Sequence, residues 1–257
     1  MEKIKNLFVI VITASLLLSC SLCRVINNLD KKANKEDKKT ETEKTETEKK
    51  QVTEEPGNNN TERTTSEVEM LEFSKNYLPS DIKYTGSIVT GKRWKDRNGE
   101  NILILTKTKV KQKKAKQPDF EEYINEAELF GYHYTGSGNS FSLLWKINDF
   151  VNDCPFDLTL DFIPGSLSIT DLNDDGIAES TFLYKMACRG DVSPSTLKLM
   201  MHEGESKYAL RGDMLVTVNG FNEGGKYKVD KSFDSAPSSF LEYAKSQWNE
   251  FRLETFR

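Results

Sequence analysis

The sequence predicts an α+β fold that is mainly β: an antiparallel sheet meander with a C-terminal amphipathic helix packed on it. Between residues 84 and 218, short runs of β-branched and aromatic residues alternate with Gly, Asn and Asp, a pattern typical of strands joined by turns. Beyond residue 238 the apolar residues recur at helical spacing instead. A repeat of about 20 to 50 residues is absent from the sequence, which argues against a solenoid or a propeller.

The predicted strands follow one another with short connections. Residues 84–90 and 101–110 flank the turn signal Asp96-Arg-Asn-Gly99. Residues 129–135 and 141–151 are expected to form a hairpin around Gly136-Ser-Gly-Asn139. The remaining predicted strands are residues 156–163, 167–170, 181–187, 196–201, 208–210 and 214–218.

Three helices are predicted beside these strands. The capping-box spacing of Ser66 and Glu69 predicts a short helix through Asn76, and residues 118–122 predict another. The C-terminal helix is expected to begin after Pro237, because Pro is favoured at the start of helices. Its apolar stripe consists of Phe240, Leu241, Ala244, Trp248 and Phe251.

The N-terminus has the pattern of a secretory signal. Lys3 and Lys5 precede an apolar run at residues 7–18, which is too short for a membrane-spanning helix. The run ends in Leu-Leu-Ser-Cys, which resembles a bacterial lipobox. The resemblance implies that residues 1–19 are removed and that Cys20 is acylated on its thiol and its new amine. An ordinary signal peptide with a chance Cys is the alternative.

Residues 20–69 are predicted to be a disordered tether between this lipid anchor and a single β-rich domain at residues 70–257. From residue 30 onward the segment consists mainly of Lys, Glu, Asp, Thr and Asn, with no aromatic residue. Such a composition buries too little apolar surface to offset the entropy of ordering. As a flexible coil of about 45 residues, it would hold the domain roughly 35–40 Å from the bilayer.

Charge and cysteine content narrow the class of protein. The formal net charge of −4 is too small to indicate nucleic acid as a partner. Cys154 and Cys188 both lie in the folded part of an exported chain, so we expect them to form a disulfide. Two buried free thiols are the alternative. Cys23, beside the anchor, receives no role.

The acidic loop at residues 171–179 predicts a Ca²⁺ site. Oxygen ligands at alternate positions, followed by Gly176 and a backbone carbonyl, suit the many oxygens that Ca²⁺ requires. The twelfth position of an EF-hand falls on Phe182, so the loop is not an EF-hand and instead resembles acidic loops that join strands in extracellular proteins. A polar turn bonded to its own amides is the alternative. The predicted metal ligands are Asp171, Asn173, Asp175, the Ile177 carbonyl and Glu179.

Other residue types give no catalytic motif. The two histidines, His133 and His202, do not have the spacing of a metalloprotease helix. His133 lies in a strand pattern, where a packed ring is expected. Trp94 and Trp145 fall near strand ends, where they suit a sugar platform, but packing in the core is the preferred interpretation.

Residues 167–211 carry a family resemblance. The acidic loop leads into Phe-Leu-Tyr, followed by Cys-Arg-Gly-Asp-Val-Ser-Pro and then by Leu-Lys-Leu-Met-Met-His-Glu-Gly. This order resembles a family of Bacteroidota envelope lipoproteins catalogued under surface polysaccharide biosynthesis. The resemblance implies a link to capsule or lipopolysaccharide and transfers no catalytic residue. Because Cys20 is not followed by the acidic cluster common in surface-exported lipoproteins of that phylum, we expect an outer-membrane anchor facing the periplasm.

Two hypotheses of function stay open. The first is a non-enzymatic, lipid-anchored module that binds an envelope protein or a glycan. The second is a polysaccharide-processing enzyme. Two carboxylates roughly 5–10 Å apart in a cleft would favour this enzyme. An exposed apolar patch would favour the binding module. The carboxylates available to such an enzyme include Asp153, Asp157, Asp161 and Glu203.

Overall fold

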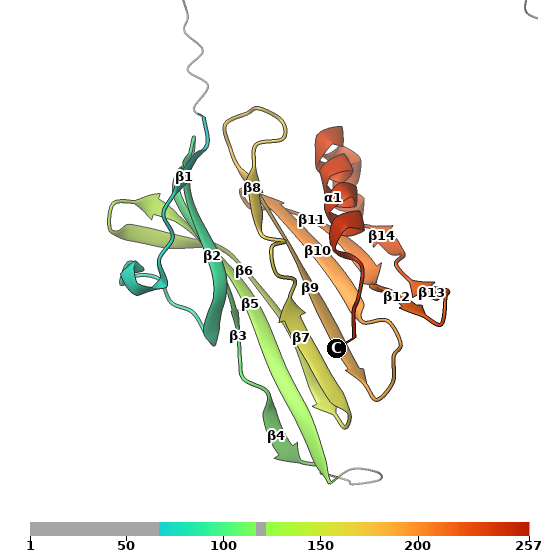
Figure 1. The fold of residues 1–257 in the computed structure, drawn as a ribbon. Helices are drawn as coiled ribbons and strands as arrows, with labels where there is room; N and C mark the ends of the chain where they lie inside the picture. Colours follow the sequence, from blue (N-terminus) through green and yellow to red (C-terminus); the bar gives the residue numbers. More distant parts are fainter. Residues whose placement is uncertain (1–66, 117–121, 257) are drawn as a thin grey trace, which may run out of the picture. The chain divides into compact units, whose positions relative to one another are not determined.

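The computed structural model describes residues 67–116 and 122–256, all of which belong to a unit that spans residues 60–257. The predicted signal peptide, Cys20, Cys23 and the tether up to residue 66 lie outside the described residues. Within them the predicted fold class is confirmed, because antiparallel strands form two main sheets and one α-helix follows near the C-terminus (Figure 1).

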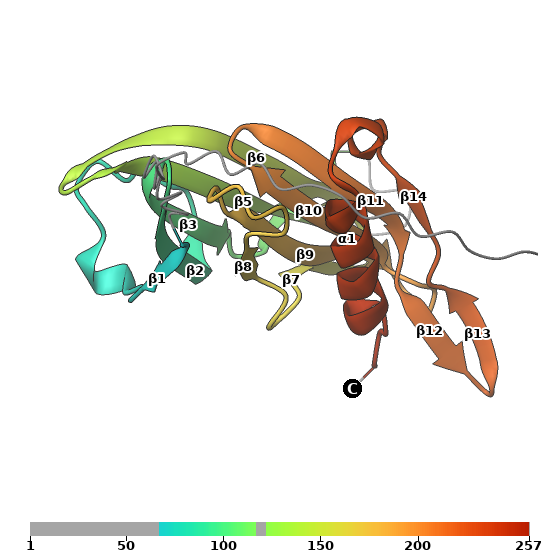
Figure 2. The same ribbon diagram turned by 90° about the horizontal axis from the view of Figure 1, so that it is seen from above.

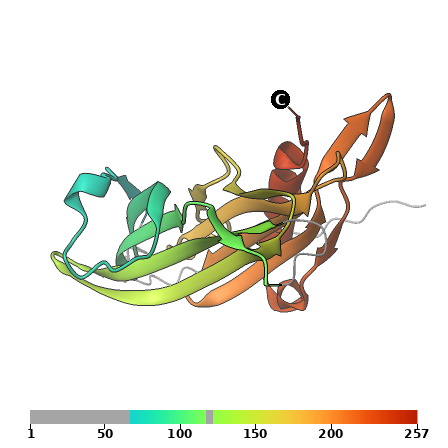
Figure 3. The ribbon, with the colours of Figure 1, turned by 90° about the horizontal axis from the view of Figure 1, so that it is seen from below.

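The first sheet has six strands, all paired antiparallel. β3 and β4 lie one after the other along one edge of β5, and β6 pairs with the opposite edge. Figures 2 and 3 show β5 and β6 as long, curved strands. The strands are β1 (Glu69–Leu71), β2 (Ser87–Asp96), β3 (Gly99–Lys107), β4 (Lys111–Lys114), β5 (Tyr123–Ser137) and β6 (Ser140–Cys154).

The second sheet also has six antiparallel strands, in the order β14-β11-β10-β9-β7, with β8 paired to the start of β9. A separate hairpin, β12 with β13, turns at Asn219-Gly220, both of which have positive φ as a tight hairpin requires. The strands are β7 (Asp157–Phe162), β8 (Ser168–Thr170), β9 (Glu179–Arg189), β10 (Thr196–Glu203), β11 (Ser206–Asp213), β12 (Leu215–Val218), β13 (Phe221–Gly224) and β14 (Tyr227–Val229).

Strand alternation places the buried side chains in three clusters. In β3, Leu103 and Leu105 join a central cluster that also includes Phe182 and Met200 of the second sheet. Ile102 and Ile104 face a cluster covered by the segment between β1 and β2. Both faces of β3 are therefore buried, and the two main sheets share one core.

The C-terminal helix α1 (Ser238–Phe251) covers the other face of the second sheet, as predicted. It begins directly after Pro237 and buries Phe240, Ala244 and Trp248 against Leu199 of β10 and its neighbours. A short 3-10 helix, η2 (Lys231–Ser235), precedes it. The helical spacing read from the sequence thus marks a true packing face.

The helix predicted from Ser66 through Asn76 is wrong. Glu69–Leu71 pairs with β2 as β1, and only η1 (Lys75–Tyr77) is helical, after Ser74 accepts a hydrogen bond from the Asn76 amide. A helix of so few residues is marginal by itself, whereas a strand gains ladder hydrogen bonds from its neighbour. The helix predicted at residues 118–122 falls almost wholly outside the described residues.

Candidate functional site

Three connections meet at one end of the two sheets, here called the loop end. They are the β2–β3 turn, the acidic loop between β8 and β9, and the β10–β11 turn. The Arg97 amide donates to the Gly176 carbonyl over 2.8 Å, and the Asn173 side chain donates to Glu203 over 2.9 Å. The acidic loop is therefore held on both sides by the neighbouring turns.

The acidic loop bonds extensively to its own backbone. The two carboxylate oxygens of Asp171 accept from the Asp175 and Gly176 amides, at 3.1 and 2.9 Å. Asn173 also accepts from the Asp175 amide, and Asp175 accepts from the Ile177 amide. Gly176 has a φ of +77°, which favours glycine, at the sharp turn that the sequence predicted.

Glu179 is the most deeply buried of the predicted metal ligands. Its Oε2 accepts from the Leu172 amide and the Thr170 hydroxyl, at 2.9 and 3.1 Å, while Oε1 has no hydrogen-bond partner among the described residues. Burial raises the pKa of the Glu179 carboxyl to about 7, against the hydrogen bonds that lower it. Glu203 lies directly opposite Glu179 across β9 and β10, and burial and the Asp175 charge also raise the pKa of Glu203.

Ca²⁺ binding by this loop stays a prediction. Within residues 67–116 and 122–256, no group of three or more His, Cys, Asp or Glu side chains is arranged to hold a metal ion. Oxygens of Asp171, Asn173 and Asp175 accept from loop amides, which the self-bonded turn explains without metal. Three carboxylates and a buried Glu179 within nine residues remain the physical reason for expecting a divalent cation.

A cleft of about 290 Å³ opens at the loop end, between the two main sheets. Asp96, Asn98 and Asn101 come from the β2–β3 region, and His133 and Thr135 come from the end of β5. Leu144 of β6 lies on the same sheet, and the opposite side is lined by Ile177 and Ala178 before β9 and by Gly204 and Glu205 of the β10–β11 turn. The sequence indicated a turn at residues 96–99, a packed ring at His133 and a metal ligand at Ile177, but it did not group them, because residues this far apart in sequence meet only after folding.

The floor of the cleft is polar and fully buried. Asn101 and His133 are each 3% exposed, and the His133 Nε2 lies 3.0 Å from the Asn101 Oδ1. The Asn101 Nδ2 donates to the Gly99 carbonyl, so Oδ1 is the acceptor and we assign the ring proton of His133 to Nε2. The Nδ1 of His133 is then a bare acceptor, without a hydrogen-bond partner among the described residues.

Three further aromatic rings pack behind this floor, those of Trp94, Trp145 and His202. His133 contacts Trp94 and Trp145, with ring centroids 5.0 and 5.3 Å apart, and Trp145 stacks on His202 at 3.9 Å. Burial lowers the pKa of both histidines to about 3, so both rings are neutral at physiological pH. The packing interpretation of Trp94 is confirmed, since its side chain is fully buried.

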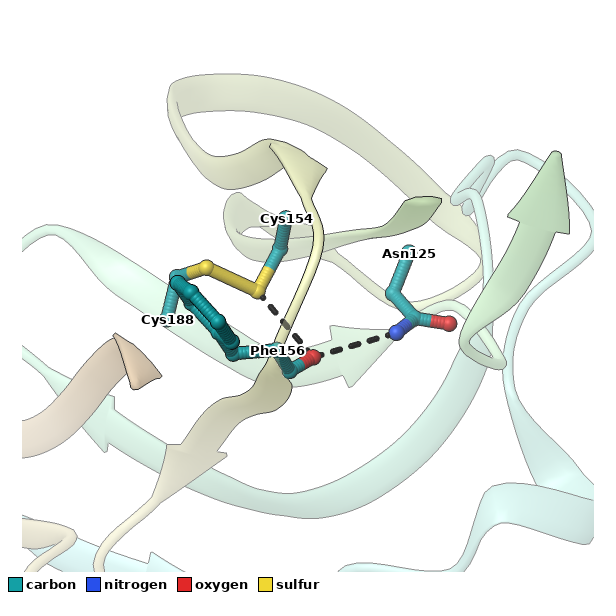
Figure 4. The surroundings of a disulfide bond; sticks show 4 residues. All are labelled: Asn125, Cys154, Phe156 and Cys188. Atoms are coloured by element: carbon teal, nitrogen blue, oxygen red, sulfur yellow. Dashed lines mark hydrogen bonds between the residues drawn. A yellow bond between two sulfur atoms is a disulfide. The ribbon is translucent and has the colours of Figure 1, made fainter. Parts of the chain in front are cut away.

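The predicted disulfide is present at the opposite end of β9. Cys154 ends β6 in the first sheet and Cys188 lies in β9 of the second, with their Cα atoms 5.6 Å apart. Asn125 donates to the Phe156 carbonyl at 3.1 Å, and that same oxygen contacts the Cys154 sulfur (Figure 4). The bond therefore joins the two sheets covalently.

A buried ion-pair network fixes Glu254, three residues beyond α1, near this end. Glu254 accepts from the Ser195 amide and hydroxyl, and its carboxylate pairs with Arg189 and Lys185 at 2.9 and 3.1 Å. Burial alone would raise the pKa of Glu254, but these hydrogen bonds outweigh it and lower the pKa to about 2. Sequence patterns gave no sign of this contact.

Two of the carboxylates suggested for an enzyme, Asp157 and Glu203, lie far apart. In the strand register, Asp157 lies opposite Arg189 at the end of β9, and Glu203 lies opposite Glu179 at the start of β9. About ten residues of β9, or roughly 33 Å, therefore separate Asp157 from Glu203. Asp161 forms an ion pair with Lys107 on the first sheet. Glu179 and Glu203 do meet, but the Glu179 side chain is closed off from solvent.

An exposed apolar surface lies beside the β12–β13 hairpin. Val192, Val218 and Phe221 are 50%, 38% and 81% exposed, and they line a shallow hollow of about 410 Å³. Figure 2 shows the hairpin extending away from the second sheet. By the criterion stated above, such a surface favours a binding module over an enzyme.

Comparison with models of protein families, with curated proteins and with solved structures finds no match for this chain. Among the described residues there is also no helix of the length and apolar character needed to cross a membrane.

Proposed function

We propose that the protein is a lipid-anchored, non-enzymatic binding module of the bacterial cell envelope, linked to the production of surface polysaccharide, either capsule or lipopolysaccharide. Acylated Cys20 attaches it to the outer membrane on the periplasmic side, and residues 20–69 act as a flexible tether. The lipobox resemblance and the resemblance at residues 167–211 supply the location and the polysaccharide link.

One structural observation carries the proposal. The Cys154–Cys188 disulfide joins the two sheets, and such bonds persist in oxidising compartments outside the cytosol. It supports an exported domain, in agreement with the signal sequence. The separation of Asp157 from Glu203, together with the exposed surface around Phe221, supports binding over catalysis.

The anchor is tested by metabolic labelling of the source bacterium with an alkyne fatty acid. We expect label on the wild-type protein and on Cys23→Ala, the matched control three residues away, but none on Cys20→Ala. Label retained by Cys20→Ala overturns the anchor.

The polysaccharide link is tested in the same strains. We expect deletion of the gene to change the amount of extracted capsule or lipopolysaccharide, with restoration by wild type but not by Cys20→Ala. Partners are identified by co-purification from membranes of wild type compared with Cys20→Ala. Unchanged polysaccharide in the deletion strain overturns the link.

A further inference from the structure

The face of the second sheet that is turned away from α1 carries three cations side by side. In the strand register, Arg211 of β11 lies opposite Lys198 of β10 on one side and opposite Lys228 of β14 on the other. Residues directly opposite in an antiparallel ladder point to the same face, with Cβ atoms about 4.5–5.5 Å apart. Their chain neighbours Leu199 and Leu210 pack in the cluster under α1, so these three residues, called the cation row below, lie on the other face.

The cation row is covered at one end and open at the other. Lys198 forms an ion pair with Asp149 of β6, and its side chain is only 23% exposed. The side chain of Arg211 is 43% exposed, and Lys228 is exposed. The first sheet therefore covers the β10 end of the row, whereas the β11–β14 end is accessible to a partner in solution.

Carboxylates of the domain neutralise this open end only in part. Asp230 accepts from the Nη1 of Arg211 over 2.7 Å, while Nε and Nη2 of Arg211 have no hydrogen-bond partner among the described residues. Lys228 forms no ion pair within residues 67–116 and 122–256. Further along the same face lie Lys207, Asp213 and Lys226. Cations thus outnumber carboxylates on this face.

The arrangement of the row favours an anionic ligand. Like charges directly opposite each other destabilise a sheet, and two such pairs follow one another across β10, β11 and β14. An anionic group held between Arg211 and Lys228 would offset this repulsion. It would also use the guanidinium nitrogens that Asp230 leaves without a partner, in charge-assisted hydrogen bonds.

The size of the charged surface limits the kind of anion. Duplex nucleic acid carries about one charge per 1.7 Å and requires a broad basic field. Here Asp213 and Asp230 border the accessible cations, so they would repel the neighbouring charges of so dense a polyanion. An acidic glycan separates its carboxylates by sugar rings, so one carboxylate can bind without placing the next against these aspartates.

We propose that Arg211 and Lys228 bind a carboxylate of an acidic glycan on the open face of β11 and β14, with Lys198 adding positive potential behind them. The charge of the ligand follows from the cation row itself. That the glycan is a surface polysaccharide rests on the proposed function. The proposal gives the binding module a ligand class and a site that the sequence did not indicate.

The test is isothermal titration calorimetry of the full-length protein in a mild neutral detergent. The probes are oligosaccharides of hyaluronan, in which uronic acids alternate with neutral sugars, and of galacturonan. Their methyl esters, which keep the sugars but lose the charge, are the matched controls, and single-stranded DNA is the alternative polyanion. We expect at least one acidic oligosaccharide to bind saturably and more weakly as salt rises, and we expect the esters and the DNA not to bind.

Charge-matched variants locate the site. Lys228→Gln and Arg211→Gln are each expected to weaken binding by roughly ten-fold, because each removes a hydrogen bond to a charged group. The double variant Lys109→Gln with Lys111→Gln removes two positive charges from exposed positions on the first sheet and should bind like wild type. Lys228 has no ion pair within the described part of the chain, so Lys228→Gln tests the site without disturbing an existing contact.

The proposal is overturned if neither acidic oligosaccharide binds, if the methyl esters bind equally well, or if DNA binds more tightly than both. It is also overturned if Lys228→Gln binds as well as the double variant on the first sheet. Fatty-acid labelling and polysaccharide yield are independent of these readouts. A failed cation row with an intact anchor and an altered polysaccharide would therefore leave the proposed function standing.

Discussion

The Asp96 carboxylate accepts a hydrogen bond from the Ala178 amide over 3.2 Å, across 82 residues of sequence. The same side chain accepts from the Trp94 ring nitrogen at 3.0 Å and from the Asn98 amide at 2.8 Å. One buried carboxylate thus closes its own turn, orients a core tryptophan and fixes the acidic loop to the first sheet.

Replacing Asp96 by Ala is expected to reduce the free energy of unfolding by about 3 kcal/mol, because it leaves buried donors without an acceptor. Urea denaturation followed by tryptophan fluorescence measures this loss. Asp174→Asn is the control, since Asp174 is exposed and Asn tolerates its positive φ, and it should change stability by less than about 0.5 kcal/mol. Equal losses in the two variants would show that the Asp96 contacts contribute little.

Removal of the disulfide is expected to destabilise the domain. Closing a loop with a sequence separation of 34 stabilises a chain by about 4 kcal/mol in the chain-entropy estimate. The double variant Cys154→Ser with Cys188→Ser should lose a comparable amount in chemical denaturation, and Cys23→Ser should lose none. Alkylation and mass spectrometry of protein purified from the source cells provide a direct check, because two alkylatable thiols at 154 and 188 would contradict the bond.

Glu254 is expected to make stability fall in acid. Its pKa of about 2 lies below the ordinary value of 4.5, so its contribution is fully present above about pH 4.5 and is lost as the pH falls toward 2. Glu254→Ala should cost about 3 kcal/mol at neutral pH, since Arg189 and Lys185 lose their partner. Glu250→Ala, an exposed helix position, serves as the control in the same melts. An acid profile identical in Glu254→Ala and wild type would contradict this assignment.

Glu179 is expected to make stability fall as the pH rises, the opposite of the effect of Glu254. Its folded pKa of about 7 lies above the ordinary value of 4.5, so folding favours the protonated form and stability falls as the pH rises from about 4.5 through 7. Glu179→Gln keeps the shape without the charge, and it should remove this decline while leaving the acid limb of Glu254 in place. Thermal melts across this pH range decide, and a decline that persists in Glu179→Gln would place its origin elsewhere.

Ca²⁺ binding at the acidic loop is expected to raise the melting temperature as calcium rises toward millimolar concentration, because the ion binds only the folded loop. Asp175→Ala should abolish that response, while Asp174→Asn, at a position that is not a predicted ligand, should retain it. A flat response in the wild type would identify the loop as a turn held by the Asp171 and Asp175 hydrogen bonds alone.

Local patterns predicted the fold class because they reflect which side chains are buried. The spacing of Phe240, Ala244 and Trp248 is the buried stripe of α1. The exposed, lysine-rich β4 carries no alternation, and sequence reasoning missed it; it also stopped β5 and β6 short of their full length. These segments are strands because they pair with a neighbouring strand, and their own composition does not indicate that pairing.

The candidate site was predictable only in part. The acidic loop could be recognised because its Asp, Asn and Glu residues lie within nine consecutive positions. The cleft could not, since Asn101 and His133 are 32 residues apart and the Ala178 wall comes from the other sheet. Their environment, including the neutral state of His133 and the burial of Glu179, depends on what folds over them.

The position of the disulfide limits how the two sheets can move. A covalent link at Cys154–Cys188 does not dissociate, whereas the loop end is held by hydrogen bonds such as Arg97 to Gly176, each worth about 1 kcal/mol net. We therefore expect relative motion of the sheets to be smallest beside the disulfide and largest at the loop end. The mouth of the cleft lies there, so the amides of residues 176–178 should exchange with solvent deuterium sooner than those flanking the disulfide.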